Sequence, residues 1–220
     1  MIVLGIDGAL GGFSAAVVRD GDLLAVEQLA ANLALERGLA AVSSALRQST
    51  VSPRGLDKIA VGVGPGSFTG VRIAISYAKS LAQGWKKPLV SVNSFDAIEA
   101  GVQVEGAVLC VIRGRKDVVS VRYRSTGQTW RESGYVTDVL QQLTLTQQKG
   151  RNSLAVLGDA EDVLPGLAER GWSVQKIHRA IEPAAAAVAT VALLRAPVQS
   201  IHEVRADYGE LPAAKVPRNL

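Results

Sequence analysis

The sequence predicts an α/β protein built as two similar lobes, each with one mixed sheet, and three observations lead to this fold class. The chain opens with strand-like apolar runs joined by tight turns, the pattern of an antiparallel meander. Helical and strand patterns then alternate, which is typical of strands that run parallel to one another. The same order, a meander followed by alternation, recurs in the second half of the chain.

The first meander is followed by an amphipathic helix. The expected strands are Ile2–Ile6, Phe13–Arg19 and Leu23–Leu29, with turns at Asp7–Gly12 and Asp20–Asp22. Connections this short demand antiparallel neighbours. Next, Leu35, Leu39, Val42 and Leu46 are spaced by four, three and four residues, which predicts that these side chains form the apolar side of a helix ending near Ser49.

The stretch Ile59–Gly84 organises the first half of the chain. It begins as a buried strand, Ile59–Val63, and turns sharply at Gly64-Pro65-Gly66, where glycine allows a positive φ. A helix follows over 70–83, and either Ser67 or Thr69 supplies its N-cap oxygen. Small residues recur at every fourth position of this helix, at Gly70, Ala74, Ala78 and Ala82. A helix that is apolar on most sides needs two packing partners, so we expect its own sheet on one side and another helix, from this chain or a second one, against the small residues.

The remaining elements complete the first pattern and repeat it. Leu89–Val92 is an expected strand, and Asn93 or Ser94 caps a short helix that runs through Ala100. The expected elements of the second half are strands at Ala107–Ile112, Val118–Arg124 and from Gln128 onward, a helix over Val136–Gln147, a strand at Leu154–Leu157, a helix ending near Arg170, a strand at Trp172–Ile177 and an alanine-rich helix from Pro183 to Leu194.

Two such lobes in tandem are the architecture of actin, hexokinase and the sugar kinases. The expected fold class is therefore a two-lobed, actin-like α/β fold of the hexokinase and heat-shock ATPase type, with a strand meander and then helix–strand alternation in each lobe. We expect an N-terminal lobe over residues 1–102, a C-terminal lobe over 103–196 and an irregular tail over 197–220. The stretch from Glu99 to Gly106 separates the two meanders and is the expected junction.

Composition narrows the classes of function. At 220 residues, with 48% apolar and 20% charged residues, the chain has the make-up of a water-soluble globular protein. The single cysteine, Cys110, excludes a disulfide framework and a cysteine-based metal site, and fits a reducing cytoplasm. The first residues lack a basic start and reach Asp7 early, which argues against a signal peptide, and no apolar run has the length of a membrane span. The net charge of +4 is typical of ordinary surface composition, although it also suits an RNA-containing complex.

The first hairpin turn carries the candidate nucleotide-binding residues Asp7, Gly8, Gly11 and Gly12. In actin-like ATPases an acidic residue and glycines at this turn face the phosphates and the metal, because backbone N–H groups there hold an anion. The alternative is that these residues only form a hairpin, since Asp-Gly is common in turns. Both interpretations remain open from sequence.

The matching turn of the second half argues against independent ATP hydrolysis. An ATPase of this architecture needs a second acidic, glycine-containing turn, whereas here the turn reads Ile112-Arg113-Gly114-Arg115-Lys116. Arginine and lysine can meet a phosphate, but they neither ligate Mg²⁺ nor act as a general base at neutral pH. We therefore expect no catalytic residues, no metal site and no cofactor.

Other candidates are weaker. Gly64–Ser67 lacks the spacing and the lysine of a P-loop, and Ser67 does not lie in a G-x-S-x-G nucleophile elbow. His178 and His202 are far apart in the sequence and offer no metal-ligand spacing. The basic cluster from Arg113 to Arg124 is typical of a solvated strand edge.

The segment VGVGPGSFTGVRIAISYAKSLAQG, from Val61 to Gly84, resembles the signature of the TsaB/YeaZ family, the small subunit of the bacterial complex that synthesises threonylcarbamoyladenosine (t6A) in tRNA. The resemblance covers the first hundred residues and thins to the order of elements and Leu157-Gly158-Asp159 in the second half. It implies an actin-like, non-catalytic scaffold that activates a larger catalytic paralogue of the TsaD type. That paralogue transfers a threonylcarbamoyl group from its adenylate to N6 of adenosine 37 in tRNAs reading codons that begin with A.

The resemblance also implies partners and an interface. The small subunit docks on its paralogue through helices that include the one after GPGSFTG, and a P-loop ATPase subunit of the TsaE type joins them. A homodimer is a further arrangement for the chain alone, tRNA is reached through the complex, and no membrane is involved. The expected interface residues, all on the helix that begins near Phe68, are Phe68, Gly70, Val71, Arg72, Ala74, Ile75, Tyr77, Ala78 and Leu81.

Two other functions stay open. One is an actin-like ATPase or sugar kinase that acts alone, which the basic second turn contradicts. The other is a hydrolase that uses Ser67, for which the sequence shows no nearby base. ATP turnover by the isolated protein and labelling of an active-site serine would distinguish these functions from a scaffold.

Overall fold

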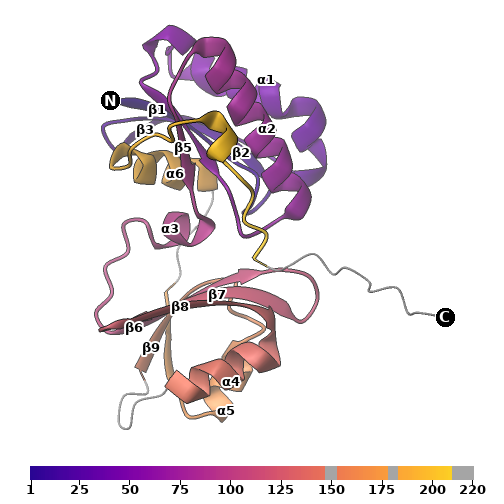
Figure 1. Ribbon diagram of the computed structural model, residues 1–220, viewed down its shortest axis with the longest axis vertical. Coiled ribbons are helices and arrows are strands. Elements are labelled where there is room, and N and C mark those ends of the chain that lie inside the picture. Colours follow the sequence, from indigo (N-terminus) through magenta and orange to yellow (C-terminus); the bar gives the residue numbers. More distant parts are fainter. Residues whose placement is uncertain (147–152, 178–182, 210–220) are drawn as a thin grey trace, which may run out of the picture.

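The computed structural model describes residues 1–146, 153–177 and 183–209 of the chain. The described residues form two lobes, one above the other in Figure 1, each built on a five-stranded sheet. The strand order is β3-β2-β1-β4-β5 in the first sheet and β8-β7-β6-β9-β10 in the second, so the two sheets follow the same path. The repeated order predicted from sequence is therefore confirmed.

The elements lie close to their predicted bounds. Those of the first lobe up to the junction are β1 (Ile2–Asp7), β2 (Phe13–Arg19), β3 (Asp22–Leu29), α1 (Ala34–Gln48), β4 (Lys58–Gly62), α2 (Phe68–Trp85), β5 (Leu89–Val92) and α3 (Ser94–Glu99). Those that follow are β6 (Ala107–Arg113), β7 (Val118–Ser125), β8 (Gln128–Tyr135), α4 (Val136–Thr146), β9 (Ser153–Gly158), α5 (Leu164–Glu169), β10 (Ser173–Lys176) and α6 (Ala184–Leu193). Short 3-10 turns occur at Ala31–Leu33, Pro53–Gly55 and Ile201–Glu203.

Each sheet is mixed, as the connection lengths require. Strand β1 pairs antiparallel with β2 and parallel with β4, and β6 pairs in the same two ways with β7 and β9. In the first lobe α1 and α2 lie side by side over one face of the sheet (Figure 1). In the second lobe α4 and α5 cover the face that points away from the first lobe (Figure 1). Segment 100–106 connects α3 to β6.

Helix α6 lies on the first sheet, although the sequence placed it within the C-terminal lobe, 103–196. It packs against β1, β2 and β4, on the face opposite to α1 and α2. Its alanines permit close contact, because a Cβ at Gly5 of β1 would overlap the Ala185 carbonyl oxygen. The Lys58 amine donates to the carbonyl oxygens of Leu193 (3.3 Å) and Arg195 (3.1 Å), at the C-terminal end of the helix where a cation is favourable. Helix α6 is apolar on nearly all sides, and packing on the first sheet buries that apolar surface. Its position late in the chain does not by itself indicate this packing.

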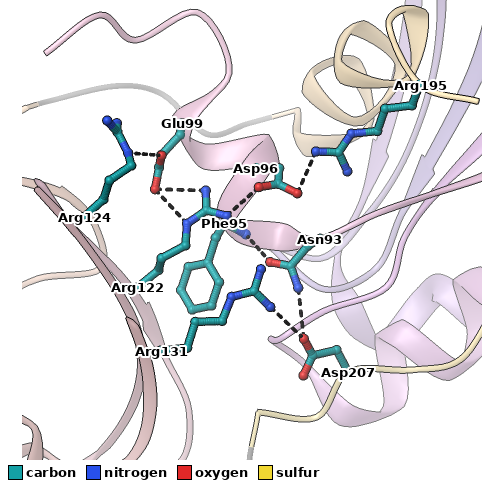
Figure 2. A network of polar contacts seen from close by, with 9 residues as sticks. All are labelled: Asn93, Phe95, Asp96, Glu99, Arg122, Arg124, Arg131, Arg195 and Asp207. Carbon is teal, nitrogen blue, oxygen red and sulfur yellow. Dashed lines mark hydrogen bonds and ion pairs between the residues drawn. The ribbon is translucent and has the colours of Figure 1, made fainter. Parts of the chain in front are cut away.

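A network of charged side chains holds the lobes together at α3 (Figure 2). The Arg122 guanidinium of β7 pairs with Asp96 and Glu99 of α3, and its side chain is only 11% exposed. Arg124 also pairs with Glu99, and Arg195, which follows α6, pairs with Asp96 at 2.8 Å. Burial tends to raise the pKa of Asp96, but its two arginine partners outweigh that and leave the pKa below its usual value. The carboxylates of α3 therefore connect residues of both lobes.

Among the described residues, no helix combines the length and the hydropathy that crossing a membrane requires.

Candidate functional site

The first hairpin turn is packed from all sides around Asp7. Its carboxyl is fully buried, and one oxygen accepts hydrogen bonds from the amides of Ala9 and Leu10, each at 2.9 Å. The other oxygen has no hydrogen-bond partner among the described residues and lies against Gly62, where a Cβ would overlap it. Burial raises the pKa of Asp7 to about 7, although the two amide hydrogen bonds lower it. The carboxyl therefore carries a proton over much of the range below neutral pH.

The start of α2 closes this turn. A Cβ at Gly8 would overlap the Gly70 carbonyl oxygen, and a Cβ at Gly70 would overlap that of Gly8, so the two backbones touch where only glycine fits. The Ser67 amide donates to the Ala9 carbonyl oxygen at 2.9 Å. Of the other predicted glycines, Gly11 is exposed and Gly12 is half-buried, with φ values of 65° and 104°. Asp7 and Gly8 are thus in contact with protein where an ATPase would hold phosphate.

The turn between β6 and β7 is exposed to solvent, and Arg113 at its start forms an ion pair. The Arg113 guanidinium pairs with Asp162 at 3.0 Å, and its amide lies 3.5 Å from the Asp159 carboxylate. The Arg115 guanidinium lies 5.9 Å from the centre of the Tyr135 ring. Sequence reasoning missed the two acids beside this turn, because they come from the segment after β9. No group of three histidine, cysteine or acidic side chains within the described ranges could hold a metal ion.

A pocket of about 170 Å³ opens between the lobes, outside the first turn. It is lined by Pro65, Phe95, Arg131, Glu132, Ser133, Asp207 and Gly209. None of the four predicted nucleotide-binding residues contributes to it.

The exposed leucines of α1 lie where this helix meets α2, and we define the α1–α2 face by Leu35, Leu39 and Tyr77. Leu35 is 69% exposed and Leu39 47% exposed, although the sequence predicted that both point inward. The two helices meet where the Tyr77 hydroxyl donates to the Leu35 carbonyl oxygen at 2.6 Å. Val42 and Leu46 face the core as predicted, together with the small residues Ala34, Gly38, Ala41 and Ala45.

The predicted interface residues of α2 divide between the surface and the core of the lobe. Phe68 and Arg72 are exposed, and Gly70, Tyr77 and Leu81 are half-buried. The others, Val71, Ala74, Ile75 and Ala78, are buried in the core of the lobe. The small-residue stripe therefore packs on the sheet and, in this structure, is not available to a second helix.

The remaining candidates are not assembled for catalysis. Ser67 accepts a hydrogen bond from the Gly70 amide at 3.2 Å and so acts as the N-cap of α2, as the sequence predicted. His202 is exposed on the turn Ile201–Glu203, and His178 lies outside the described residues. Within the described part of the chain, the Ser67 hydroxyl forms no hydrogen bond with a histidine that could act as a base.

Comparison with known proteins decides the family. A family model described as TsaD, tRNA N6-adenosine threonylcarbamoyltransferase, matches residues 26–162. The chain belongs to the TsaD family. Among the members of this family, the match to TsaB of Bacillus subtilis is 33% identical over 122 residues and covers 54% of this chain and 53% of that protein. The match to TsaB of Escherichia coli is 37% identical over 101 residues and covers 46% and 44% of the two chains. This TsaD-family chain thus matches about half the length of these curated relatives.

Solved structures agree on the fold. A Pseudomonas aeruginosa protein, described as similar to the peptidase YEAZ, superposes with a TM-score of 0.71 at 21% identity and covers 95% of this chain and 99% of its own. YeaZ from Pseudomonas aeruginosa gives a TM-score of 0.68 at 22% identity, with 94% and 99% covered. The resemblance of this TsaD-family chain to the TsaB/YeaZ group, and its two-lobed actin-like fold, are confirmed.

Proposed function

We propose that this chain is a non-catalytic subunit of an assembly that makes N6-threonylcarbamoyladenosine at position 37 of tRNA. In this proposal it docks through its α1–α2 face on a larger catalytic paralogue of the TsaD type and activates it. The TsaB relatives are tRNA threonylcarbamoyladenosine biosynthesis proteins, which supplies the pathway. The observation that carries the docking role is the exposed pair Leu35 and Leu39 beside Tyr77. Apolar side chains gathered on one face of a folded chain are typical of protein–protein contacts.

The closed first turn supports a role without catalysis. Its only carboxyl, Asp7, is buried and has a pKa raised to about 7, and Gly8 lies against the backbone of Gly70. A nucleotide phosphate would have to displace the start of α2 to reach the amides of this turn. The assembly would take its chemistry from the TsaD-type subunit, with a P-loop ATPase of the TsaE type as a third member.

The same proposal implies where the chain acts and which molecules it meets. The chain would act in the cytoplasm, where tRNA is modified, and would meet tRNA through the complex rather than alone. In the absence of the paralogue, the α1–α2 face could pair two copies of the chain.

The alternative functions now have less support. An ATPase or sugar kinase acting alone would need an open first turn, whereas Asp7 is fully buried. A hydrolase would need an activated Ser67, whose oxygen instead accepts the Gly70 amide. Magnesium-dependent ATP turnover by the isolated protein that an Asp7→Ala variant abolishes would restore the first alternative.

Reconstitution tests the proposal. The purified chain is combined with the TsaD-type and TsaE-type proteins of the same organism, tRNA and threonylcarbamoyl adenylate, and modified adenosine is measured. We expect modification to require the chain and expect Leu39→Arg to reduce both modification and binding to the TsaD-type protein at least ten-fold, because a charge is buried without a partner. Leu23→Arg is the matched control, since Leu23 is 48% exposed against 47% for Leu39 but lies on the edge strand β3. Full modification without the chain, or equal activity of both variants, would refute the proposed role.

A further inference from the structure

The second sheet presents an apolar face to the first lobe. Helices α4 and α5 cover its far face, whereas α6 packs on the first sheet (Figure 1). The near face is covered by α3, which contacts β6 and β9. The near-face residues that share one core with Phe95 and Ile98 of α3 are Val108, Cys110, Ile112, Ala155 and Leu157. Separating the lobes would therefore expose apolar surface to water, which is unfavourable.

The segment 204–209 extends from the first lobe to the second (Figure 1), and we call it the clasp. Asp207 in this segment contacts both lobes. In the first lobe, its amide donates to the Val63 carbonyl oxygen at 2.7 Å, and its carboxylate accepts from the Asn93 side chain at 2.9 Å (Figure 2). In the second lobe, the same carboxylate pairs with Arg131 of β8 at 3.7 Å. The clasp therefore joins the loop that precedes α2 to the edge strand of the second sheet.

Gly209 is wedged between the two lobes. An added Cβ at this position, where φ is 70°, would lie 2.4 Å from the Ser120 Oγ and 2.9 Å from the Ser133 Oγ. These serines are cross-strand partners on β7 and β8, and the Ser133 hydroxyl donates to that of Ser120 at 2.8 Å. The same Cβ would lie 3.2 Å from Pro65 of the first lobe. Only a residue without a side chain fits this gap.

The clasp also fills space between the lobes. The pocket that remains there measures about 170 Å³, and Pro65, Asp207 and Gly209 form part of its wall. Pockets for small molecules measure about 300 to 1,000 Å³. In many two-lobed proteins a ligand bridges the lobes and closes them about a hinge. Here a segment of the chain itself makes such a bridge.

We infer that the clasp holds the two lobes of this chain in one orientation, in the place of a bridging ligand, and that its release lets them separate. The ion pairs of Glu99 lie next to the junction 100–106, whereas Asp207 lies at the other end of the network (Figure 2). Rotation about the junction would move the clasp contacts apart by more than the pairs of Glu99. The inference does not depend on the proposed function, because it rests on contacts within the chain.

The single cysteine of the chain reports on separation of the lobes. Cys110 is fully buried on the near face of the second sheet, and burial raises the pKa of its thiol. A thiol-reactive disulfide reagent therefore reaches it only after the chain opens. The labelling rate of the folded, full-length chain is measured for the wild type, Asp207→Ala and Gly209→Ala. We expect both variants to label at least ten-fold faster than the wild type, because each weakens the clasp.

Two control variants separate lobe opening from other effects. Gly171→Ala adds a Cβ at a φ of 77°, close to that of Gly209, but with no atom within 4 Å. It should label at the wild-type rate. Leu167→Ala removes a fully buried side chain from the core beneath α5, on the far face. It should lower the unfolding free energy in urea more than the clasp variants do, because it leaves a cavity, yet label no faster than the wild type.

Three results would overturn the inference. One is labelling of both clasp variants at the rate of the wild type and Gly171→Ala. Another is labelling that follows the unfolding free energy across all variants, fastest in Leu167→Ala, because Cys110 would then be reached by unfolding. The third is faster labelling in Asp96→Asn but not in the clasp variants, which would assign the hold to α3 alone. No partner protein enters these measurements, so their failure leaves the proposed function untouched.

Discussion

The two hairpin turns occupy equivalent places in sheets of the same strand order, yet they are stabilised by different forces. The turn after β1 is held by packing: Asp7 is fully buried and Gly8 touches the backbone of α2. The turn after β6 is closed by backbone hydrogen bonds, with the Gly114 amide donating to the Val118 carbonyl oxygen at 2.9 Å, and it carries the ion pair of Arg113 and Asp162, whose side chains are 50% and 40% exposed. One topology therefore supports one buried and one exposed turn, and neither offers the arrangement of acids and glycines that a shared phosphate site would need.

The largest expected difference between the two turns is in how each makes stability depend on pH. Asp7 has a folded-state pKa of about 7 against an ordinary value of 3.8, so the folded state holds its proton more tightly than the unfolded state. This contribution is complete below pH 3.8 and is lost as the pH rises toward and through 7, by about 4 kcal/mol in total. Urea unfolding from pH 4 to 8 should show a decline that Asp7→Asn flattens. The declines would be equal in wild type and variant if Asp7 were ionised and solvated in the folded protein.

Glycine substitution gives the next largest difference. Gly8→Ala should lower the unfolding free energy by about 3 kcal/mol, because its Cβ meets backbone atoms that cannot rotate away. Gly114→Ala in the second turn should cost less, since its Cβ would lie 3.1 Å from the Val118 carbonyl oxygen. Gly84→Ala in α2 is the control, with no atom within 4 Å, and should be neutral or slightly stabilising. Thermal or urea unfolding measures all three, and equal costs at Gly8 and Gly84 would contradict a closed first turn.

Removing the exposed ion pair should have the smallest effect. Arg113→Gln is expected to change stability by less than about 1 kcal/mol, because solvent screens partners that are this exposed. The effect should shrink further in high salt. A loss of several kcal/mol would show that the second turn is as tightly packed as the first, and the contrast between them would disappear.

Local patterns predicted the elements and their pairing well. Short turns after β1 and β2 required antiparallel neighbours, and the Ser67 cap followed from a hydroxyl ahead of a helical pattern. The side of α1 that faces the core was harder to predict, because Leu35 and Leu39 form a stripe next to the stripe of small residues. The close approach of the Tyr77 ring to Gly38 turns the small residues inward and leaves Leu35 and Leu39 exposed.

Contacts between distant segments were beyond the reach of pattern reasoning. Asp159 and Asp162 lie beside a turn more than forty residues earlier in the chain, at Arg113. Sequence analysis gave Tyr208 no role, because nothing local shows that its ring meets Phe68. The position of α6 depends on which sheet face lacks a cover, and that is a property of the assembled lobe.

The return of α6 to the first sheet determines when that sheet is covered during synthesis on the ribosome. Val3, Val18, Ala60 and Val90 are fully or almost fully buried, and they share a core with Val188, Ala189 and Ala192 of α6. When β1 to β5 have left the exit tunnel, that sheet face still has no helix, and all of the second lobe must be translated before its cover arrives. The nascent chain therefore presents an uncovered apolar sheet while the second lobe is translated, which is the surface that a ribosome-associated chaperone would bind.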